Sequence, residues 1–461
     1  MAGKKYQMDM CCGPLFRKII LFTLPLIATA ALQQLFSAAD LIMVGRYASY
    51  QDMAAVGSCL PVCGLIVNVF FGISIGAGVL TANGIGAKDK LLTSRSIHTA
   101  MMFSGVGGIG LMIFGLIVTY PLLKLMDTPP DVIGKAAWYM AIYCLGLPTL
   151  SLYAYGASLL RAMGDTKRPL YYLIFSGIAN VALNYFLVAI CSLGVIGVAF
   201  ATMFSFAVSA VLVIRALMYM PGALKLKKSL LKIDWDIFRQ MLKIGLPAGV
   251  QGGFFAISNF VIQGAINSFG SAAMAGSAAA LNVETILYSA SFGFNQAATS
   301  FAGQNMGAGK YERVKQSAIQ CAVTSGVGLA IIGTLCTIWG RQLIAVCNPD
   351  PEVVEWGMQR AIAVFASYGL CAVMDSITGT LRGMGKSTGP MVVSLFGVCV
   401  TRMAWVWMVF SSIRSMKVLM LCYPVSYIIT IIITGIMLYF ELKKYHISFR
   451  KQHIYGSVIK K

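Results

Sequence analysis

The chain has 461 residues, of which 58% are hydrophobic and only 11% charged, and it carries a net charge of +20. Soluble domains have about 25% charged residues, so this composition excludes an ordinary soluble protein and predicts an all-α integral membrane protein. The positive charge would also suit a nucleic-acid-binding protein, but the positions of the basic residues along the chain exclude that class.

Apolar segments of bilayer-spanning length recur along the whole chain, since about 20 helical residues cross the hydrocarbon core. Turn signals rich in Pro and Asp, such as Thr128–Asp131 and Asn348–Pro351, separate several of them. We predict twelve transmembrane helices, at about residues 17–44, 53–80, 96–123, 135–160, 169–190, 193–219, 237–266, 273–303, 316–345, 355–381, 390–411 and 416–440.

The segments between these spans differ in charge. If the N-terminus is cytoplasmic, most of the 36 Lys and Arg residues fall in cytoplasmic segments; the outer segments hold only a few, Arg360 among them, and Arg402 lies inside the eleventh span. Cytoplasmic loops are enriched in these residues, and a missed or extra span would destroy the alternation. We therefore expect a multi-pass protein of the cell (plasma) membrane with both termini in the cytoplasm.

Two halves of the chain carry matching segments. Ser158–Asp165, at the end of the fourth span, matches Gly379–Lys386 at the end of the tenth, and Asn83–Lys88 matches Gln304–Gly309 at the same spacing. Parallel repeats of this kind place substrate and ion sites near the middle of the membrane. We expect two pseudo-symmetric six-helix bundles: an N-lobe at residues 1–220, a cytoplasmic linker at 221–240 and a C-lobe at 241–461.

The first span contains a carboxylate among apolar residues. Its polar residues share one helix face: Thr29, Gln33, Ser37 and Asp40. An ionisable group on such a stripe usually faces a cavity and marks an ion or substrate pathway. The alternative is that Asp40 lies at the outer membrane interface, because Gly45–Tyr47 follow closely. Pro25 interrupts the same helix, where we expect it to act as a hinge.

Three carboxylates lie deep in the predicted spans: Asp40, Glu284 and Asp375. Because a charge at the bilayer centre costs about 3 kcal/mol on insertion scales, these are the candidates for ion coupling. Arg402 is a possible partner for Asp375, either in a structural salt bridge or beside a carboxylate with a direct cation role. Glu284 either lines a C-lobe cavity or supports a polar helix contact.

Further polar stripes occur in two other spans. They are formed by Ser176, Asn180 and Asn184 in the fifth span and by Asn259, Gln263 and Asn267 in the seventh. Polar residues also hold membrane helices together, so a stripe alone is a weak functional signal. The sequence has no P-loop, no Ser/His/Asp cluster and no metal-ligand spacing. We therefore expect that the protein is not an enzyme and uses no cofactor or metal. The function that remains is transport driven by a proton or sodium gradient.

Several motifs resemble those of the multidrug and toxic compound extrusion (MATE) family. They are Leu24-Pro25, Ala39–Gly45, Ala54–Gly57, the Gly86-Ala87 and Gly307–Gly309 loops, and Leu381–Gly385, and the resemblance covers essentially the whole chain. It implies a V-shaped pair of six-helix bundles with a central cavity. It also implies antiport of cationic or amphipathic compounds against protons or sodium.

The resemblance assigns roles to individual positions. Asp40 matches the first-helix carboxylate of the cation site and Asn180 a polar residue of that site, whereas Asn184 stands where proton-coupled relatives commonly carry a second Asp. Asp375 matches the tenth-helix carboxylate of sodium-coupled relatives, but Phe255 stands where those relatives carry a Glu. Each lobe thus has half of a known site, and the coupling ion stays open, with a slight preference for the proton.

We therefore expect a secondary active multidrug exporter that works by alternating access. The cation-coupling residues would be Asp40, Asn180, Asn184 and Asp375, and the substrate cavity would be lined by Gln33, Ser37, Glu284 and Arg402. One alternative is a flippase for lipid-linked polysaccharide or cell-wall precursor, which would need more basic residues in its cavity than the single intramembrane Arg402. A receptor or channel is the other, and the repeat of whole halves argues against it.

The expected partners follow from this interpretation. They are small-molecule drugs or toxic cations, a proton or sodium ion and the lipid bilayer, with no nucleic acid. We expect the protein to act as a monomer.

Overall fold

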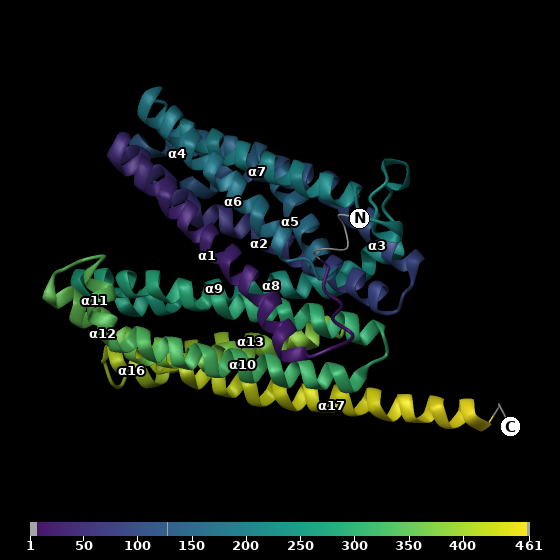
Figure 1. Ribbon diagram of the computed structural model, residues 1–461. Coiled ribbons are helices and arrows are strands. Elements are labelled where there is room, and N and C mark those ends of the chain that lie inside the picture. Colours follow the sequence, from purple (N-terminus) through teal and green to yellow (C-terminus); the bar gives the residue numbers. More distant parts are fainter. Residues whose placement is uncertain (1–6, 127, 459–461) are drawn as a thin grey trace. The chain divides into compact units, whose positions relative to one another are not determined.

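The computed structural model describes residues 7–126 and 128–458, without the side chains of residues 60–62, 65, 66 and 446–458. This part of the chain is helical and contains no strand (Figure 1). The helices are α1 (Leu15–Tyr47), α2 (Tyr50–Gly86), α3 (Lys90–Leu125), α4 (Pro130–Leu145), α5 (Leu147–Ala162), α6 (Lys167–Asn184), α7 (Gly194–Met218), α8 (Trp235–Asn267), α9 (Ser271–Gly307), α10 (Tyr311–Ile338), α11 (Gly340–Ala345), α12 (Pro351–Ala366), α13 (Tyr368–Gly383), α14 (Thr388–Ser394), α15 (Thr401–Ala404), α16 (Met416–Met420) and α17 (Cys422–Val458). The π-helical segments are η2 (Tyr185–Ile190), η5 (Leu395–Val400) and η6 (Trp405–Phe410), and the 3₁₀ turns are η3 (Gly222–Leu224) and η4 (Lys228–Leu230).

These helices account for the twelve predicted spans. Within the described residues, nine helices are long and apolar enough to cross a membrane, and the bent pairs α4–α5 and α12–α13 supply one span each. The twelfth is α9, which has the length of a span but buries many Ser, Thr, Asn and Gln side chains. The exterior of the span helices is apolar, for example at Ile113, Phe114 and Ile117 of α3, as contact with lipid requires.

The two bent spans have identifiable causes. The axis turns by 47° between α4 and α5, where Gly146 is followed by Pro148 in the first turn of α5, and proline removes a backbone donor there. It turns by 43° between α12 and α13 at Ser367, whose hydroxyl donates to the carbonyl of Val364 at 2.9 Å. Back-bonding of this kind bends helices.

The described chain forms two compact units. Of the described residues, unit 1 comprises 7–9 together with Ala28–Val250, and unit 2 comprises Met10–Ile27 together with 251–458. Both α1 and α8 are therefore divided between the units, α1 directly after Ile27 and α8 directly after Val250. In each helix the division follows shortly after an internal proline, Pro25 or Pro247.

In unit 1, α2 packs tightly against the first half of α8 through small residues. A Cβ at Gly72 would lie 2.3 Å from the backbone nitrogen of Gly249, and one at Gly76 would lie 2.2 Å from the carbonyl oxygen of Met241. Gly245 of α8 makes the same kind of close approach to α2, since a Cβ added to it would lie 2.4 Å from Cα of Ile73. Backbones approach this closely only where both helices present glycine, which is the usual device of membrane helix packing.

The segment between α7 and α8 is attached to α3. Nε of Arg95 donates to Oδ2 of Asp234 at 2.6 Å, and the backbone amide of Lys227 donates to Nε2 of His98 at 3.0 Å. Because α8 begins at Trp235, residues 235–240, which were expected in the linker, are helical.

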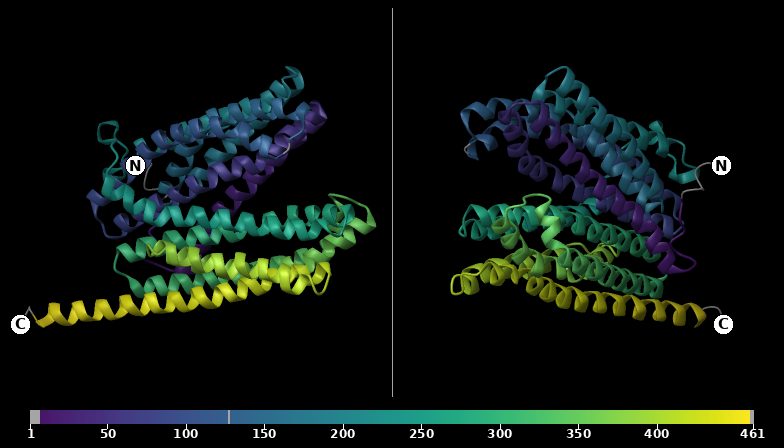
Figure 2. Two further views of the ribbon diagram at one scale, coloured as in Figure 1. Left: turned by 180° about the vertical axis from the view of Figure 1, so that it is seen from behind. Right: turned by 60° about the vertical axis from the view of Figure 1, so that its left-hand side comes forward.

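In unit 2, α9 lies at the centre and packs against α10, α12 and α13. Gly379 and Gly383 of α13 allow this, since a Cβ at either would lie 2.4 Å from a carbonyl oxygen of α9. The first half of α1 joins the same unit through Phe22, whose ring meets Phe301 edge-on at 5.6 Å. The helices of unit 2 run side by side, with α17 at the edge of the unit in every view (Figure 2).

Candidate functional site: one polar pocket in each unit

Unit 1 encloses a pocket of about 310 Å³ between α1, α2, α6, α7 and the bent pair α4–α5. Its lining combines aromatic and aliphatic side chains with hydroxyl and amide groups. The polar lining residues are Gln33, Ser37, Asp40, Ser176, Asn180, Thr202, Ser205 and Ser209, together with Tyr139, Tyr143 and Tyr153. A largely apolar cavity with a few convergent polar groups is typical of a small-molecule site.

Asp40 is held in this pocket by hydrogen bonds from two other helices. Nδ2 of Asn184 donates to Oδ1 of Asp40 at 2.5 Å, and the hydroxyl of Thr202 donates to Oδ2 at 3.4 Å. Nδ2 of Asn184 also lies 3.3 Å from Oδ1 of Asn180. The first helix, the fifth span and the sixth span thus meet at one carboxylate.

The backbone around Asn184 changes pitch at this point. Asn184 is the last residue of α6, and the π-helical segment η2 begins at Tyr185. Such π segments are rare and occur frequently at functional sites, because the extra residue re-aims the neighbouring side chains. Asn184 is fully buried, and its amide oxygen has no hydrogen-bond partner among the described residues.

The electrostatics of the unit 1 pocket are simple. Asp40 is the only charged side chain among the described residues that line it. The hydroxyl oxygen of Thr202 lies 3.4 Å from its carboxylate, and the amide oxygen of Asn180 lies 3.3 Å from the Asn184 nitrogen that donates to it. Carboxylate, amide and hydroxyl oxygens are the ligands that hard cations prefer. The arrangement can accept a proton, a small cation or the cationic group of a substrate.

Unit 2 encloses a second pocket of about 320 Å³. It is lined by Gly252, Phe255, Ala256 and Asn259 of α8, by Leu281, Glu284, Thr285 and Tyr288 of α9, and by Tyr368, Cys371, Met374, Asp375, Arg402, Tyr423 and Tyr427. Unlike the first pocket, it contains charges of both signs.

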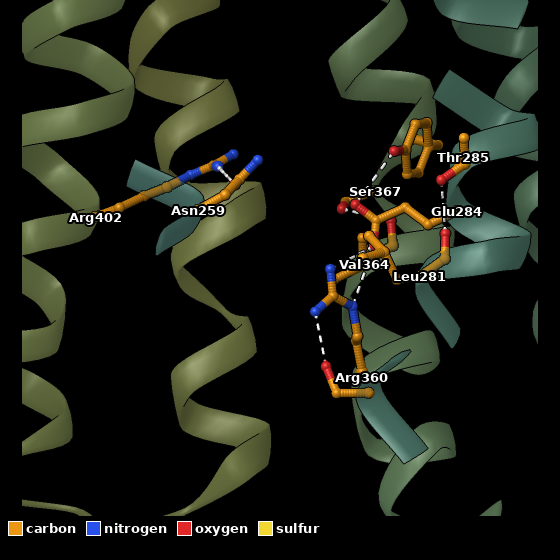
Figure 3. A network of polar contacts seen from close by, with 10 residues as sticks. Asn259, Leu281, Glu284, Thr285, Arg360, Val364, Ser367 and Arg402 are labelled. Carbon is orange, nitrogen blue, oxygen red and sulfur yellow. Dashed lines mark hydrogen bonds and ion pairs between the residues drawn. The ribbon is translucent and has the colours of Figure 1, made fainter. Parts of the chain in front are cut away.

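Glu284 forms a buried ion pair with Arg360 of α12 (Figure 3). Nη2 and Nε of Arg360 donate to Oε2 of Glu284 at 2.7 and 3.1 Å, and the hydroxyl of Tyr368 donates to Oε1 at 3.3 Å. Nη1 of Arg360 donates to Ser277 at 2.9 Å. The carboxylate charge of Glu284 is therefore neutralised within the unit.

Asp375 and Arg402 line the same pocket but form no ion pair among the described residues. The hydroxyl of Ser291 donates to Oδ2 of Asp375 at 2.6 Å. Arg402 instead donates from Nε to Ser426 at 3.0 Å and from Nη1 to Asn259 at 3.3 Å. The structural salt bridge considered from the sequence is absent from this structure.

Two expectations about arginine were wrong. Arg360 was assigned to an outer segment, but it lies inside α12 and is only 4% exposed. Arg402 is not the single buried arginine of the spans: Arg360 and Arg382 are also buried, and Nη2 of Arg382 donates to Gln251 at 2.7 Å. Their carboxylate and amide partners are far away in sequence, so charge counting along the chain could not pair them.

A signal for Arg360 was nevertheless present in the sequence. Arg360 shares one face of α12 with Val353, Gly357, Ala361 and Val364, all of which are buried. An arginine on the apolar face of an amphipathic helix has to find a buried partner.

The remaining expected residues divide between the two pockets. Gln33 and Ser37 line the first pocket with Asp40 and Asn180, while Glu284, Asp375 and Arg402 line the second. Thr202 was missed, although it recurs with Ser205 and Ser209 at helical spacing along α7.

The fold is that of a polytopic membrane protein with a polar pocket in each unit. A model of the MatE family matches residues 25–186 and 247–408, one match in each half of the sequence. The chain belongs to the multidrug and toxic compound extrusion (MATE) family, which confirms the resemblance seen in its motifs.

Relatives and solved structures agree with this assignment. The "Probable multidrug resistance protein YoeA" of Bacillus subtilis (strain 168) is 28% identical over 395 residues, which cover 83% of this chain and 84% of that protein. A "Probable multidrug resistance protein NorM" of Thermotoga maritima is 25% identical over 399 residues, 84% of each chain. A crystal structure of MATE in the bent conformation superimposes with a TM-score of 0.89 at 17% identity, over 95% of this chain and 98% of the other. The predicted fold of twelve transmembrane helices in two bundles is thereby confirmed.

Proposed function

We propose that the protein exports cationic or amphipathic small molecules across the cell membrane, in exchange for a proton or a sodium ion. The observation that carries this proposal is the unit 1 pocket, in which Asp40 is the only charged lining residue among those described. Two relatives are named probable multidrug resistance proteins, which supports the same substrate class.

Coupling would arise from competition for one carboxylate. When Asp40 is ionised, it attracts a cationic substrate; when a proton or sodium ion neutralises it, that attraction is lost and the substrate leaves. Asn184 and Thr202 hold the carboxylate on the pocket side by their hydrogen bonds. A ligand shifts a conformational equilibrium only by its differential affinity for the two states, and here the difference lies in the charge of Asp40.

The proton is the slightly preferred coupling ion. A proton needs a single carboxylate, which Asp40 supplies. A sodium ion would need several oxygens, and the partnerless amide oxygen of Asn184 is the best additional ligand. In unit 2, Asp375 faces a pocket that also contains Arg402, and this fixed positive charge disfavours a second cation there.

The test is efflux from proteoliposomes in which a pH gradient and a sodium gradient are imposed separately. Asp40→Asn should lower gradient-driven export of a cationic dye such as ethidium to the background rate, while Asp131→Asn, an exposed carboxylate of the same unit, should export at the parental rate. Export by Asp40→Asn at the parental rate would overturn the assignment. Export driven by sodium alone and lost only in Asp375→Asn would move coupling to unit 2.

The flippase alternative receives less support. Recognition of a phosphorylated lipid-linked sugar calls for several cationic side chains in the cavity, and the described lining of the unit 1 pocket contains none. In unit 2, Arg360 is occupied by Glu284, which leaves Arg402 as the unpaired arginine of the lining.

The hinge, the topology and the oligomeric state complete the proposal. Pro25 would provide the hinge, because the carbonyl of Leu21 lacks its usual helical partner and α1 is divided between the units directly after Ile27. We further propose that the protein acts as a monomer with both termini in the cytoplasm, although the first and last residues lie outside the described part of the chain.

A further inference from the structure

Arg402 is a buried arginine whose contacts within the described part of the chain are with neutral groups. It lies in α15, a short helical segment between the π-helical segments η5 and η6, and it is 2% exposed. Its hydrogen bonds go to the hydroxyl of Ser426 and the amide oxygen of Asn259. Its guanidinium lies 4.1 Å from the ring centre of Tyr423 and 5.3 Å from that of Tyr427. No carboxylate in the described part of the chain lies within ion-pair distance.

The contrast with Arg360 in the same unit is direct (Figure 3). Arg360 has Glu284 as a carboxylate partner at 2.7 Å, whereas Arg402 donates to the uncharged side chains of Asn259 and Ser426. Removing a charge from water costs several kcal/mol per ion unless an opposite charge compensates it. Arginine cannot escape this cost by losing its proton.

The charged groups around the unit 2 pocket differ in their partners. Glu284 is neutralised by Arg360. Asp375 accepts from Ser291, and its backbone carbonyl accepts from Asn295, whose side-chain oxygen in turn accepts from Arg382. Glu284 is thus paired with another arginine, whereas the carboxylate of Asp375 accepts from a neutral hydroxyl. Arg402 is left without an ion-pair partner among the described residues.

The walls of the pocket indicate what kind of anion would fit. Five aromatic side chains line it: Phe255, Tyr288, Tyr368, Tyr423 and Tyr427. Its volume of about 320 Å³ lies at the lower end of the range for small-molecule sites, about 300–1,000 Å³. One or two fused aromatic rings with a short acidic side chain fit such a space, with the rings against aromatic walls and the carboxylate on the guanidinium.

We propose that the unit 2 pocket is a binding site for amphipathic aromatic carboxylates, whose carboxylate pairs with Arg402. This goes beyond the proposed export of cationic compounds, because it concerns a second pocket and ligands of the opposite charge.

A purely structural role for Arg402 makes a different prediction. Arg402 connects α15 to α17 through Ser426 and to α8 through Asn259. If it only clamps these helices, its replacement lowers stability but leaves the protein with no preference for anionic ligands. Charge selectivity in binding is therefore the property that separates the two roles.

The experiment measures binding of three matched probes to the purified full-length protein by isothermal titration calorimetry. The probes are 1-naphthaleneacetate, its neutral amide 1-naphthaleneacetamide, and the cation 1-naphthylmethylammonium. We expect the parental protein to bind the acetate at least about 10-fold more tightly than the amide, since a hydrogen-bonded charge contributes roughly 1.5–3 kcal/mol. Arg402→Gln should remove that preference and should not weaken binding of the cation.

Two further variants make the result decisive. Arg341→Gln removes an exposed arginine of the same unit and should keep the preference, which controls for net charge. Arg402→Lys keeps the charge and should keep part of the preference if the glutamine variant fails to fold. Equal affinities for acetate and amide in the parental protein, or an acetate preference that survives Arg402→Gln, would overturn the proposal. Because no efflux is measured, a failure of the proposed export function would leave this test intact.

Discussion

Asn184 donates a hydrogen bond to Asp40 from the point where α6 passes into a π-helical segment. The two residues stand on the first and fifth spans of unit 1, and Asn180 lies one turn earlier on α6, 3.3 Å from the same amide nitrogen. The amide orients the carboxylate and leaves its own oxygen without a partner in the described structure. A site of this design depends on the amide as much as on the acid.

Replacement of Asn184 should therefore impair transport without unfolding the protein. Asn184→Ala removes the shortest hydrogen bond to Asp40, and the loss of a bond to a charged group costs about 1.5–3 kcal/mol. We expect ethidium efflux to fall by about 10-fold or more, measured in cells and in proteoliposomes. Asn282→Ala, at an exposed position of α9, is the control; equal efflux from both variants would show that Asn184 has no part in coupling.

Pro25→Ala should slow transport more than it weakens substrate binding. Alanine restores the backbone donor that proline lacks, and the helix becomes harder to bend. Turnover and ethidium affinity should be measured separately on the same preparation. Pro121→Ala changes another proline inside a helix and should have little effect on turnover. Unchanged turnover with lost binding in Pro25→Ala would instead assign Pro25 to the pocket wall.

The Glu284–Arg360 pair should show strong coupling in a double-mutant cycle. Removal of one partner leaves a buried charge uncompensated, which costs about 3–5 kcal/mol, so Glu284→Gln and Arg360→Gln should each lower the melting temperature markedly. The double variant should recover most of the loss. The exposed pair Arg341–Glu355, with side chains 64% and 53% exposed, is the matched control and should contribute at most about 1 kcal/mol. Additive effects at Glu284 and Arg360 would contradict the pairing.

Gly76→Ala should destabilise unit 1. The added Cβ would lie 2.2 Å from the carbonyl oxygen of Met241, so α2 and α8 have to move apart, and overpacking of this kind costs about 1–3 kcal/mol. Gly110→Ala adds the same methyl group to α3 where no atom lies within 4 Å. Thermal unfolding in detergent should distinguish the two variants, and similar melting temperatures would show that the helices accommodate the methyl group.

The attachment of the α7–α8 segment should weaken in acid. Burial of the Asp234 carboxylate acts to raise its pKa, but the hydrogen bond from Arg95 and the nearby backbone amides outweigh this and hold the pKa below its usual value of 3.8. A lowered pKa contributes stability that is present above the unfolded value and is lost as the pH falls through the folded value.

Asp234→Asn should reproduce the acid state at neutral pH. Trypsin should then cleave faster within Lys225–Lys232, because the segment has lost its ion pair to α3. Asp236→Asn, an exposed carboxylate of the first turn of α8, should be cleaved at the parental rate. Equal rates for both variants would show that the ion pair does not hold the segment.

Hydropathy and charge were sufficient to locate the spans, because both depend on local composition. The spacing of Ser176, Asn180 and Asn184 also indicated a polar helix face, and Asn180 and Asn184 lie at the Asp40 site. Partnerships between distant residues could not be inferred in the same way. The hydrogen bond between Thr202 and Asp40 and the ion pair between Arg360 and Glu284 depend on which helices pack together. The π-helical turns beside Asn184 and Arg402 leave no clear pattern in the sequence.

The polarity of α9 has a consequence for how the protein is made. A helix enters the bilayer from the translocon according to its own hydrophobicity, and Glu284 alone costs about 3 kcal/mol at the centre of a span. The groups that satisfy α9 stand later in the chain, on α12 and α13. It follows that α9 is a poor independent membrane segment, so its stable insertion awaits synthesis of the helices that follow it.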